Sequence, residues 1–433
     1  MNDNKDKLYI VLVSVHGLIR GQDLELGRDA DTGGQTKYVV ELLRELGERP
    51  EVEQVDLLTR RVIDDAVSED YREPIESISN KARIVRIDCG EEGYLPKEEL
   101  WDSLDNFADN MLEYITAQNR APDIIHSHYA DAGYVCNRIS HQLNIPLIHT
   151  GHSLGRSKRK QLLAGGMKRD DIEQRYNISR RIDAEEEVQG TAELIITSTR
   201  QEIIEQYGMY DYYQPERMNV IPPGTDLEKF YPPQGDEYES HIYHDISRFL
   251  QEPKKPIILA LSRPDHRKNI NTLVEAYGES EELKQLANLV IIAGNRDEIR
   301  DMDSGVQDVL NEIFLSIDSY DLYGKVAYPK HHHPDDVPVI YRLSAASGGV
   351  FINPALTEPF GLTLIEAAAS GVPIIATEDG GPTDIIDNCH NGYLIDPLDK
   401  QSIIEMLLKL LTDGDNWKRL SHNGIEGVRQ HYS

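Results

Sequence analysis

Two successive series of short apolar segments, each alternating with helical patterns, constrain the fold of this chain most strongly. In the first half, the strand-like segments are residues 8–13, 55–58, 82–87, 124–126, 147–150 and 194–197. In the second half, they are residues 257–261, 289–293, 326–328, 350–352, 373–376 and 393–395. Between strands, residues such as Val39, Leu42, Leu43 and Leu46 fall on one helical face. This alternation predicts an α/β protein with two doubly wound sheets.

The length of 433 residues suggests two domains rather than one. A stretch rich in Pro, Gly, Tyr and acidic residues spans 215–256 and reads as an interdomain connection. We therefore expect a first domain over 1–225, a connection over 226–255 and a second domain over 256–433. Residues 403–411 have a helical pattern. The chain stops soon after a further helix-like segment, an abrupt end that is compatible with a truncated C-terminus.

Composition excludes several classes of function. The formal net charge of −30 argues against nucleic-acid binding through a broad basic surface. No apolar run approaches the roughly 20 residues that span a bilayer, which argues against a membrane protein. The polar start of the chain, residues 1–7, shows no secretory signal. The three cysteines lie far apart, give no zinc pattern and fit a reducing cytoplasm.

One segment of the second half, residues 351–366, combines an apolar strand, a turn and the start of a helix. Pro359 disfavours helix at Glu358, and Gly361 permits close approach of the backbone to a ligand. A helix should start at about residue 362 or 363 and reach Gly371, a suitable C-terminal cap. Its free N–H groups would attract an anion such as a diphosphate. Glu358 would lie beside that anion, and Glu366 one turn into the helix.

The two glutamates, eight residues apart, resemble the E-x7-E motif of retaining glycosyltransferases with the GT-B fold. The resemblance implies two Rossmann-like doubly wound domains that face a central cleft. The alternative is an ordinary buried strand–turn–helix with two solvated glutamates. Arg263 and Lys268 in the same half follow a strand and lead into a helix. Two such cations could neutralise a diphosphate leaving group, and the alternative is a solvated basic loop.

Longer stretches in both halves make the resemblance more specific: the chain resembles sucrose-phosphate synthases of plants and cyanobacteria-like bacteria. The matching stretches are SVHGLIRG (14–21), GRDADTGGQ (27–35), HYADAG (128–133), TGHSLGR (150–156), TSTRQE (197–202) and AYPKHH (327–332), together with 351–366. The family implies glucosyl transfer from a nucleotide sugar, usually UDP-glucose, to fructose 6-phosphate. The product would be sucrose 6-phosphate, and a separate phosphatase would complete the pathway. The choice between UDP, ADP and GDP donors stays open.

On the donor side, the resemblance implies that Arg263 and Lys268 contact the diphosphate. Backbone around residues 360–362, that is Phe360, Gly361 and Leu362, would contact glucose and phosphates. Glu358 would hold a glucose hydroxyl and Glu366 the ribose hydroxyls.

On the acceptor side, the adjacent glycines Gly33 and Gly34 precede a helix and permit close approach of a ligand. As a bare pattern they also fit a simple tight turn. The resemblance implies that they form a loop over donor phosphates and acceptor, and that Gln35 bonds the fructose.

The phosphate of the acceptor needs its own cations. Lys97, Lys158 and the pair Arg180–Arg181 match the family's fructose 6-phosphate site, and Tyr129 and Ser153 would supply hydroxyls. Each cation could instead be a solvated surface charge. Neighbouring arginines point to different helix faces, so spacing does not choose between Arg180 and Arg181.

Sucrose and the donor both carry an α-glucosyl unit, so the reaction retains configuration. The resemblance implies attack on the same face, with the departing phosphate helping to deprotonate the acceptor hydroxyl. The resemblance assigns His152 to a glucose hydroxyl and to stabilising the oxocarbenium-like state; the alternative is a structural histidine. Glu358 is treated as a binding residue rather than a nucleophile. The expected catalytic set is thus His152, Glu358, Arg263 and Lys268.

No cofactor or bound metal is expected. The run of three histidines at 331–333 looks like a metal cluster, but consecutive residues point in different directions. The triplets 29–31 and 301–303 have the D-x-D form of metal-dependent transferases. We expect the first to order the glycine loop, and neither to bind a metal. Two rival functions remain: a sucrose synthase that uses free fructose, which the acceptor cations disfavour, and a catalytically silent sugar-phosphate sensor.

Overall fold

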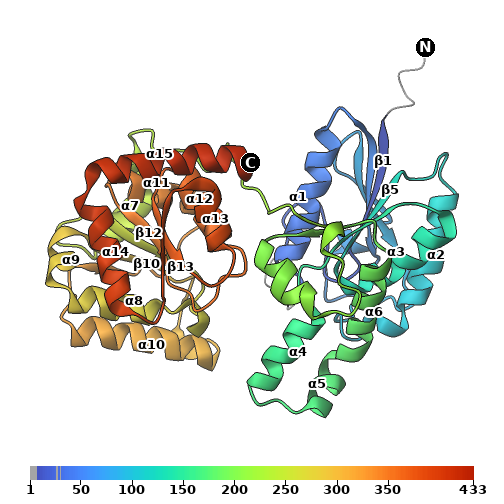
Figure 1. Ribbon diagram of the computed structural model, residues 1–433, viewed down its shortest axis with the longest axis horizontal. Helices are drawn as coiled ribbons and strands as arrows, with labels where there is room; N and C mark the ends of the chain where they lie inside the picture. Colours follow the sequence, from blue (N-terminus) through green and yellow to red (C-terminus); the bar gives the residue numbers. More distant parts are fainter. Residues whose placement is uncertain (1–6, 26–27, 30) are drawn as a thin grey trace. The chain divides into compact units, whose positions relative to one another are not determined.

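Two mostly parallel β-sheets organise the chain, one in each of two units that divide between Ile221 and Pro222. The computed structural model describes residues 7–25, 28–29 and 31–433. Within each unit, helices cover both faces of the sheet (Figure 1). The predicted α/β class with two doubly wound sheets is therefore confirmed.

The first sheet has the strand order β3-β4-β2-β1-β5-β6-β7-β8. Its strands are β1 (Leu8–Val13), β2 (Val52–Arg60), β3 (Ile75–Ser77), β4 (Ala82–Ile87), β5 (Ile124–His128), β6 (Leu147–Thr150), β7 (Leu194–Thr197) and β8 (Met218–Val220). Only β3 pairs antiparallel, with β4. The six expected strands are all present. The edge strands β3 and β8 were not expected, because three residues are too few to show a period.

Six helices complete the first unit as the structure describes it: α1 (Gly34–Glu48), α2 (Leu104–Thr116), α3 (Tyr129–Leu143), α4 (Gly155–Ala164), α5 (Arg169–Tyr176) and α6 (Ile178–Thr191). Helices α4 and α5 form a hairpin that projects from the unit (Figure 1). Ile172 is the one residue of α5 that is buried. The hairpin is therefore held mainly at its base, where α4 packs on α6.

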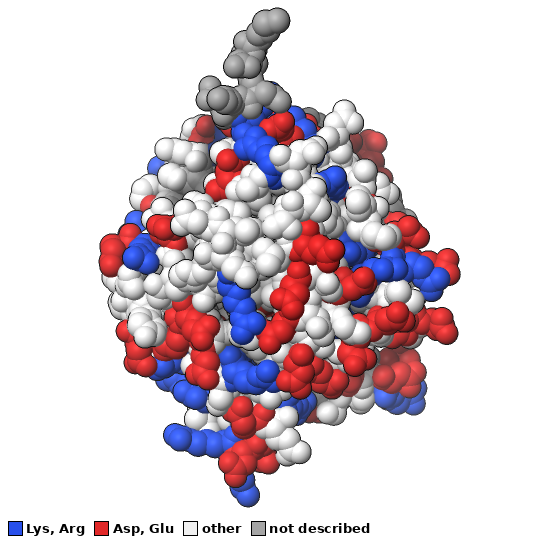
Figure 2. Space-filling model, turned by 90° about the vertical axis from the view of Figure 1, so that its right-hand side faces the viewer, with Lys and Arg blue, Asp and Glu red and all other residues white. Residues whose placement is uncertain are grey.

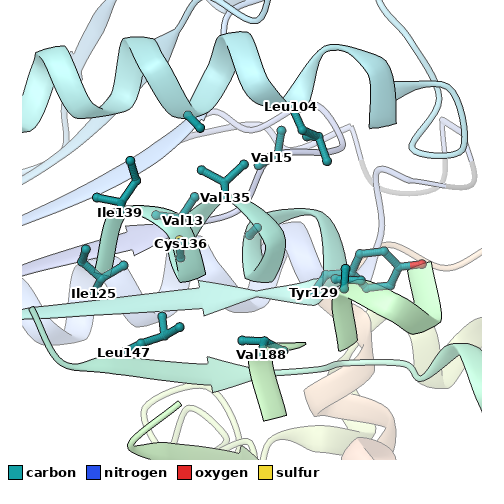
Figure 3. Packing of buried hydrophobic residues seen from close by; sticks show 14 of the residues in the cluster. Val13, Val15, Leu104, Ile125, Tyr129, Val135, Cys136, Ile139, Leu147 and Val188 are labelled. Atoms are coloured by element: carbon teal, nitrogen blue, oxygen red, sulfur yellow. The ribbon is translucent and has the colours of Figure 1, made fainter. Parts of the chain in front are cut away.

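The main core of the first unit lies between the sheet and α3. Val13, Ile125 and Leu147 lie on the neighbouring strands β1, β5 and β6 and are buried with Val135 and Ile139 of α3 (Figure 3). Strands covered by helices on both faces are apolar along most of their length, as β1 is. This burial fixes the strand ends, from which the site loops emerge.

The second sheet has the order β11-β10-β9-β12-β13-β14 and is parallel throughout. Its strands are β9 (Ile257–Leu261), β10 (Asn288–Ile292), β11 (Val326–Ala327), β12 (Val350–Asn353), β13 (Ile374–Thr377) and β14 (Gly392–Ile395). Counted from β9, this is the 3-2-1-4-5-6 order of nucleotide-binding sheets. The order reverses between β9 and β12, which is where such sheets bind ligands.

Nine α-helices of the second unit flank this sheet: α7 (His241–Ser247), α8 (Ile270–Glu279), α9 (Glu281–Leu286), α10 (Ser304–Ser319), α11 (Asp336–Ala346), α12 (Leu362–Ala369), α13 (Pro382–Cys389), α14 (Lys400–Thr412) and α15 (Gly414–His431). The helix expected over 403–411 lies within α14. Residues 226–255, the expected connection, lie in the second unit, where Ile242 and Ile246 of α7 are buried in the core.

The surface is strongly charged but mixed. The face drawn in Figure 2 carries acidic and basic side chains next to one another, without a continuous basic area. Among the described residues, no helix is both long and apolar enough to cross a membrane.

Candidate active site

Several candidate residues of the first unit lie in the loops or first helical turns that follow β1, β5 and β6. Without its edge strands, this sheet has the same doubly wound order as the second, with its reversal between β1 and β5. Gly33 and Gln35 follow β1, Tyr129 follows β5, and His152 and Ser153 follow β6. The fold thus brings together segments that are more than 100 residues apart in the sequence.

The glycine turn leaves open space in front of α1. Gly33 is the N-cap residue of α1 and Gly34 its first residue. A Cβ atom added at either glycine would meet, among the described residues, no atom within 4 Å beyond its chain neighbours and the helix's own backbone. The side-chain amide of Gln35 donates to Ser14 Oγ (3.1 Å) and to the backbone carbonyl of His128 (3.4 Å). Gln35 therefore anchors the start of α1 to the loop after β1 and to the end of β5, while the described residues leave space for a ligand beside the two glycines.

Asp29 orders this turn, as expected. Its Oδ1 atom accepts hydrogen bonds from the backbone N–H groups of Asp31 and Thr32, both at 2.8 Å. Its Oδ2 atom accepts one from Thr32 Oγ1 (3.1 Å). Partial burial opposes the charge, but these hydrogen bonds hold the pKa of Asp29 below its usual value. Gly27 and Ala30 of the same motif lie outside the described residues.

His152 sits on a strained turn beside other histidines. It has a positive φ of 56°, unusual for a residue with a side chain. Its Nε2 atom lies 3.0 Å from Nδ1 of His128, and its ring packs edge-on against Tyr38. Burial lowers the pKa of His152 to about 3. Its imidazole is therefore neutral at physiological pH and suits hydrogen bonding to a neutral hydroxyl.

Three cations of the first unit meet at one pocket. Lys97, Lys158 and Arg181 line it together with Tyr129, and its remaining walls are Glu98, Trp101, Asp131 and Tyr176. The Arg181 guanidinium carbon lies 4.5 Å from the centre of the Tyr129 ring. Arg181 also donates to Ser153 Oγ (3.2 Å). The expected acceptor residues Lys97, Tyr129, Ser153 and Lys158 are thus neighbours in space.

Each of these cations is held by its surroundings. Lys97 bonds Asp31 through both its backbone N–H (2.7 Å) and its ammonium group. Arg181 donates from Nε to Glu185 (2.9 Å). Lys158 lies 3.9 Å above the Tyr176 ring. Burial, reinforced by the nearby charge of Arg181, lowers the pKa of Lys158 to about 8.

The two adjacent arginines differ in burial and in their partners. The side chain of Arg181 is 4% exposed and reaches the pocket. The side chain of Arg180 is 49% exposed and pairs with Asp102 at the surface. The neighbours therefore lie on different faces of α6, as helix geometry requires.

In the second unit, the candidate donor residues follow β9 and β12, the two strands between which the strand order reverses. Lys268, after β9, donates to Glu358 Oε2 (2.7 Å), after β12. Asn353, the last residue of β12, donates to the same oxygen (2.8 Å). Arg263 follows β9 and is exposed. Within the described part of the chain, no ion pair involves Arg263, so its charge is available to a ligand.

The turn between Glu358 and α12 is tightly packed against the start of α13. Glu358 bridges to Gly380, whose φ is 111°. Gly361 has a φ of 103° and is the N-cap of α12, so the expected glycine turn is confirmed. The helix ends at Ala369, followed by Gly371 with a φ of 82°. The first N–H groups of α12, at Leu362 and after, are those that lack intrahelical acceptors.

Glu366 lies one turn into α12, where Tyr341 donates to its carboxylate (3.3 Å). Phe360, which precedes the N-cap, packs near Tyr432. The structure thus brings Lys268, Glu358 and the N-terminus of α12 together within the second unit.

Three residues that the sequence analysis did not single out lie in or beside these sites. His16 pairs through Nδ1 with Asp131 (2.7 Å), and both are buried. Asn353 fixes Glu358, as described above. His16 and Asp131 stand within the matched stretches 14–21 and 128–133, but neither stretch shows that they pair.

Among the described residues, no group of three or more His, Cys, Asp or Glu side chains could hold a metal ion. In the histidine run, His331 instead lies 3.4 Å from Asp297 in an exposed ion pair.

Two family models match the chain. Residues 6–246, more than half of it, match "Sucrose synthase first GT-B domain", and residues 244–427 match "Glycosyl transferases group 1". The chain is 46% identical to sucrose-phosphate synthase 4 of Arabidopsis thaliana and 47% identical to a sucrose-phosphate synthase of Zea mays. These alignments cover 98% and 99% of this chain and 46% of each relative. The chain therefore spans about half the length of the curated relatives it matches.

A solved structure of a sucrose-phosphate synthase from Thermosynechococcus elongatus is also similar. It superposes with a TM-score of 0.69 at 26% sequence identity, over 99% of this chain and 95% of that chain. The two sheets described above are thus those of the GT-B fold.

Proposed function

Because the chain belongs to the sucrose-phosphate synthase family of GT-B glycosyltransferases, we propose that it transfers glucose from UDP-glucose to fructose 6-phosphate. The product is sucrose 6-phosphate, and the configuration of the glucosyl unit is retained. The observation that carries the proposal is the convergence of Lys97, Lys158 and Arg181 on one pocket. In a chain with a net charge of −30, such a gathering of cations indicates a phosphoryl ligand.

On the acceptor side, these three cations bind the phosphate and Arg180 does not. Gln35 bonds the fructose, and the hydroxyls of Tyr129 and Ser153 complete the contacts. Gly33 and Gly34 form the loop over acceptor and donor phosphates; the space in front of them supports this role.

On the donor side, Arg263 and Lys268 bind the diphosphate, aided by the backbone of Phe360, Gly361 and Leu362 at the start of α12. Glu358 holds a glucose hydroxyl, and its bonds from Lys268 and Asn353 support a positioning role. Glu366 takes the ribose hydroxyls of the nucleotide.

In the reaction, the bond from the glucose anomeric carbon to the diphosphate breaks, and a bond to the acceptor hydroxyl forms on the same face. The hydroxyl proton passes to the departing phosphate. Arg263 and Lys268 stabilise the charge that the diphosphate gains. Neutral His152 orients a glucose hydroxyl. The protein thus acts by placement and by charge stabilisation.

The decisive assay compares fructose 6-phosphate with fructose as acceptors, following the release of UDP. Charge-assisted hydrogen bonds contribute roughly 1.5–3 kcal/mol each, so loss of two should lower kcat/KM by about 10²–10⁴. Equal values for the two acceptors would overturn the proposal in favour of a sucrose synthase. Absence of UDP release with either acceptor would favour a sugar-phosphate sensor. Parallel assays with ADP-glucose and GDP-glucose determine the donor base.

We further propose that no metal ion takes part, because Arg263 and Lys268 already supply the positive charge at the diphosphate. Dialysis against EDTA should therefore leave kcat within about twofold; restoration of a lost activity by Mg²⁺ would contradict this. The product requires a separate phosphatase to yield sucrose. A cytoplasmic location is consistent with the three free cysteines, which are all buried.

A further inference from the structure

The cations of the acceptor pocket have carboxylate partners of two kinds. Asp31 and Glu185, which hold Lys97 and Arg181, have side chains only 3% and 1% exposed. They are also fixed by other donors: Asp31 by the backbone N–H of Lys97, and Glu185 by the backbone N–H of Gly155. These two carboxylates are permanent parts of the pocket wall.

Glu98 is different. Its side chain is 21% exposed, and its carboxylate lies between two cations, 3.4 Å from Lys97 and 3.8 Å from Lys158. These separations are those of ion pairs rather than of short hydrogen bonds. Asn177 donates a hydrogen bond to the backbone carbonyl of Glu98, and among the described residues the carboxylate itself contacts only the two lysines. Its carboxylate can therefore leave at small cost.

Both cations remain in place when Glu98 moves away. Lys97 keeps its bond to Asp31. Lys158 keeps the ring of Tyr176, whose face attracts an ammonium group. The two ammonium groups would then face an open position in a pocket that Arg181 also lines. A phosphoryl group offers more acceptor oxygens and more charge than one carboxylate, so it can replace Glu98.

We propose that Glu98 is a displaceable counter-ion of the acceptor site and determines its specificity. The inference rests on the proposed function, because it takes the phosphoryl group of the acceptor as the displacing ligand. While the site is empty, Glu98 neutralises Lys97 and Lys158. Weak monoanions fail to displace it, whereas a phosphate ester does. Glu98 thereby lowers the affinity for all anions and raises the selectivity for the phosphorylated sugar.

The test is direct binding, measured by calorimetry at pH 7 on the whole chain without donor. Glu98→Gln removes the charge and keeps the shape. It should bind fructose 6-phosphate and inorganic phosphate about three- to tenfold more tightly than wild type, by the usual size of such ion pairs. Acetate, a carboxylate probe, should become detectable as a competitor. Glu98→Ala should change affinity in the same direction, because only the charge matters.

Glu99→Gln is the matched control. Glu99 is the next residue, is exposed and has no ion pair in the described part of the chain. This variant should bind as wild type does. Lys158→Met tests the site itself and should weaken fructose 6-phosphate binding at least tenfold.

Suppose that both Glu98 variants bind fructose 6-phosphate no more tightly than wild type, while Lys158→Met binds it more weakly. This result overturns the proposed role of Glu98 and leaves the acceptor site in place. If wild type binds no fructose 6-phosphate, or Lys158→Met binds as tightly as wild type, the proposed acceptor site is wrong and the inference falls with it.

Discussion

The proposed acceptor pocket of the first unit and the proposed donor site of the second differ in how their cations are buried and paired with carboxylates. In the pocket, Lys97 faces Asp31 and Lys158 faces Glu98, which are carboxylates from other segments, whereas Arg181 faces Glu185 one turn further along α6. In the proposed donor site, Lys268 pairs with Glu358, and Arg263 is exposed. A buried cation requires a built counter-charge, whereas an exposed one is solvated until its ligand arrives. Arg181 is thus part of the folded core and Arg263 is not, whereas Lys158 and Lys268 are both about one quarter exposed.

The largest test of this contrast concerns catalysis on the donor side. Lys268→Met should lower kcat by about 10²–10³, because one donor to the leaving diphosphate is lost, yet leave the Tm nearly unchanged. Steady-state UDP release and thermal unfolding measure the two effects. Arg267→Met is the matched control from the same loop, since Arg267 is 72% exposed and its side chain pairs with Asp265 of that loop. Equal activity losses in both variants would show that the loop, not Lys268, matters.

The second test concerns stability on the acceptor side. Arg181→Met leaves Glu185 buried without its cation, at a cost of about 3–5 kcal/mol. For a unit of this size, the Tm should fall by roughly 6–20 °C. Arg180→Met removes only a surface ion pair and should shift the Tm by about 2 °C or less. Scanning calorimetry distinguishes them, and a similar Tm for both variants would contradict the division between buried and exposed cations.

A third test compares the glycines of the two sites. Gly34→Ala should keep the Tm, because the added Cβ meets no distant atom of the described residues within 4 Å. It should nevertheless lower kcat/KM by about tenfold or more through displacement of substrate. In contrast, Gly361→Ala should destabilise the second unit by about 1–2 kcal/mol, because Gly361 has a φ of 103° and a Cβ there would meet Leu364 at 2.7 Å. A wild-type kcat/KM for Gly34→Ala would refute a ligand in front of α1.

The smallest effect is a pH dependence of the acceptor side alone. The pKa of Lys158, lowered to about 8 mainly by burial, means that its charge is present below pH 8 and lost as the pH rises through that value. The KM for fructose 6-phosphate should therefore rise severalfold between pH 7.5 and 9, by up to about tenfold per unit above the pKa. Lys158→Arg should give a flatter profile, since arginine stays charged. An unchanged slope in that variant would assign the titration to another group.

Local motifs predicted the strand, turn and helix start that carry the proposed donor residues. Glu358, Pro359, Gly361 and Glu366 fall within nine consecutive residues, so their order alone implies the turn and the helix start. The approach of Lys268 to Glu358, 90 residues apart, follows from the adjacent pairing of β9 and β12. The part that was not predictable is Asn353, whose amide contact depends on the side-chain geometry of the turn.

The segment 226–255 shows a limit of composition. Its prolines, glycines and acids suggested a connection, yet α7 buries Ile242 and Ile246 in the second core. A helix of seven residues shows too few turns for its apolar period to stand out from such a background.

The sequence by itself determined the alternation of strands and helices, and hence the two doubly wound sheets, because period and turn chemistry are local properties of the chain. It also determined which residue types could meet phosphate and sugar. Only the tertiary structure decided that Arg181 rather than Arg180 enters the pocket, and that Glu98 stands between Lys97 and Lys158. Those choices depend on the rotation of α6 against the sheet and on the packing of distant loops, which no local pattern encodes.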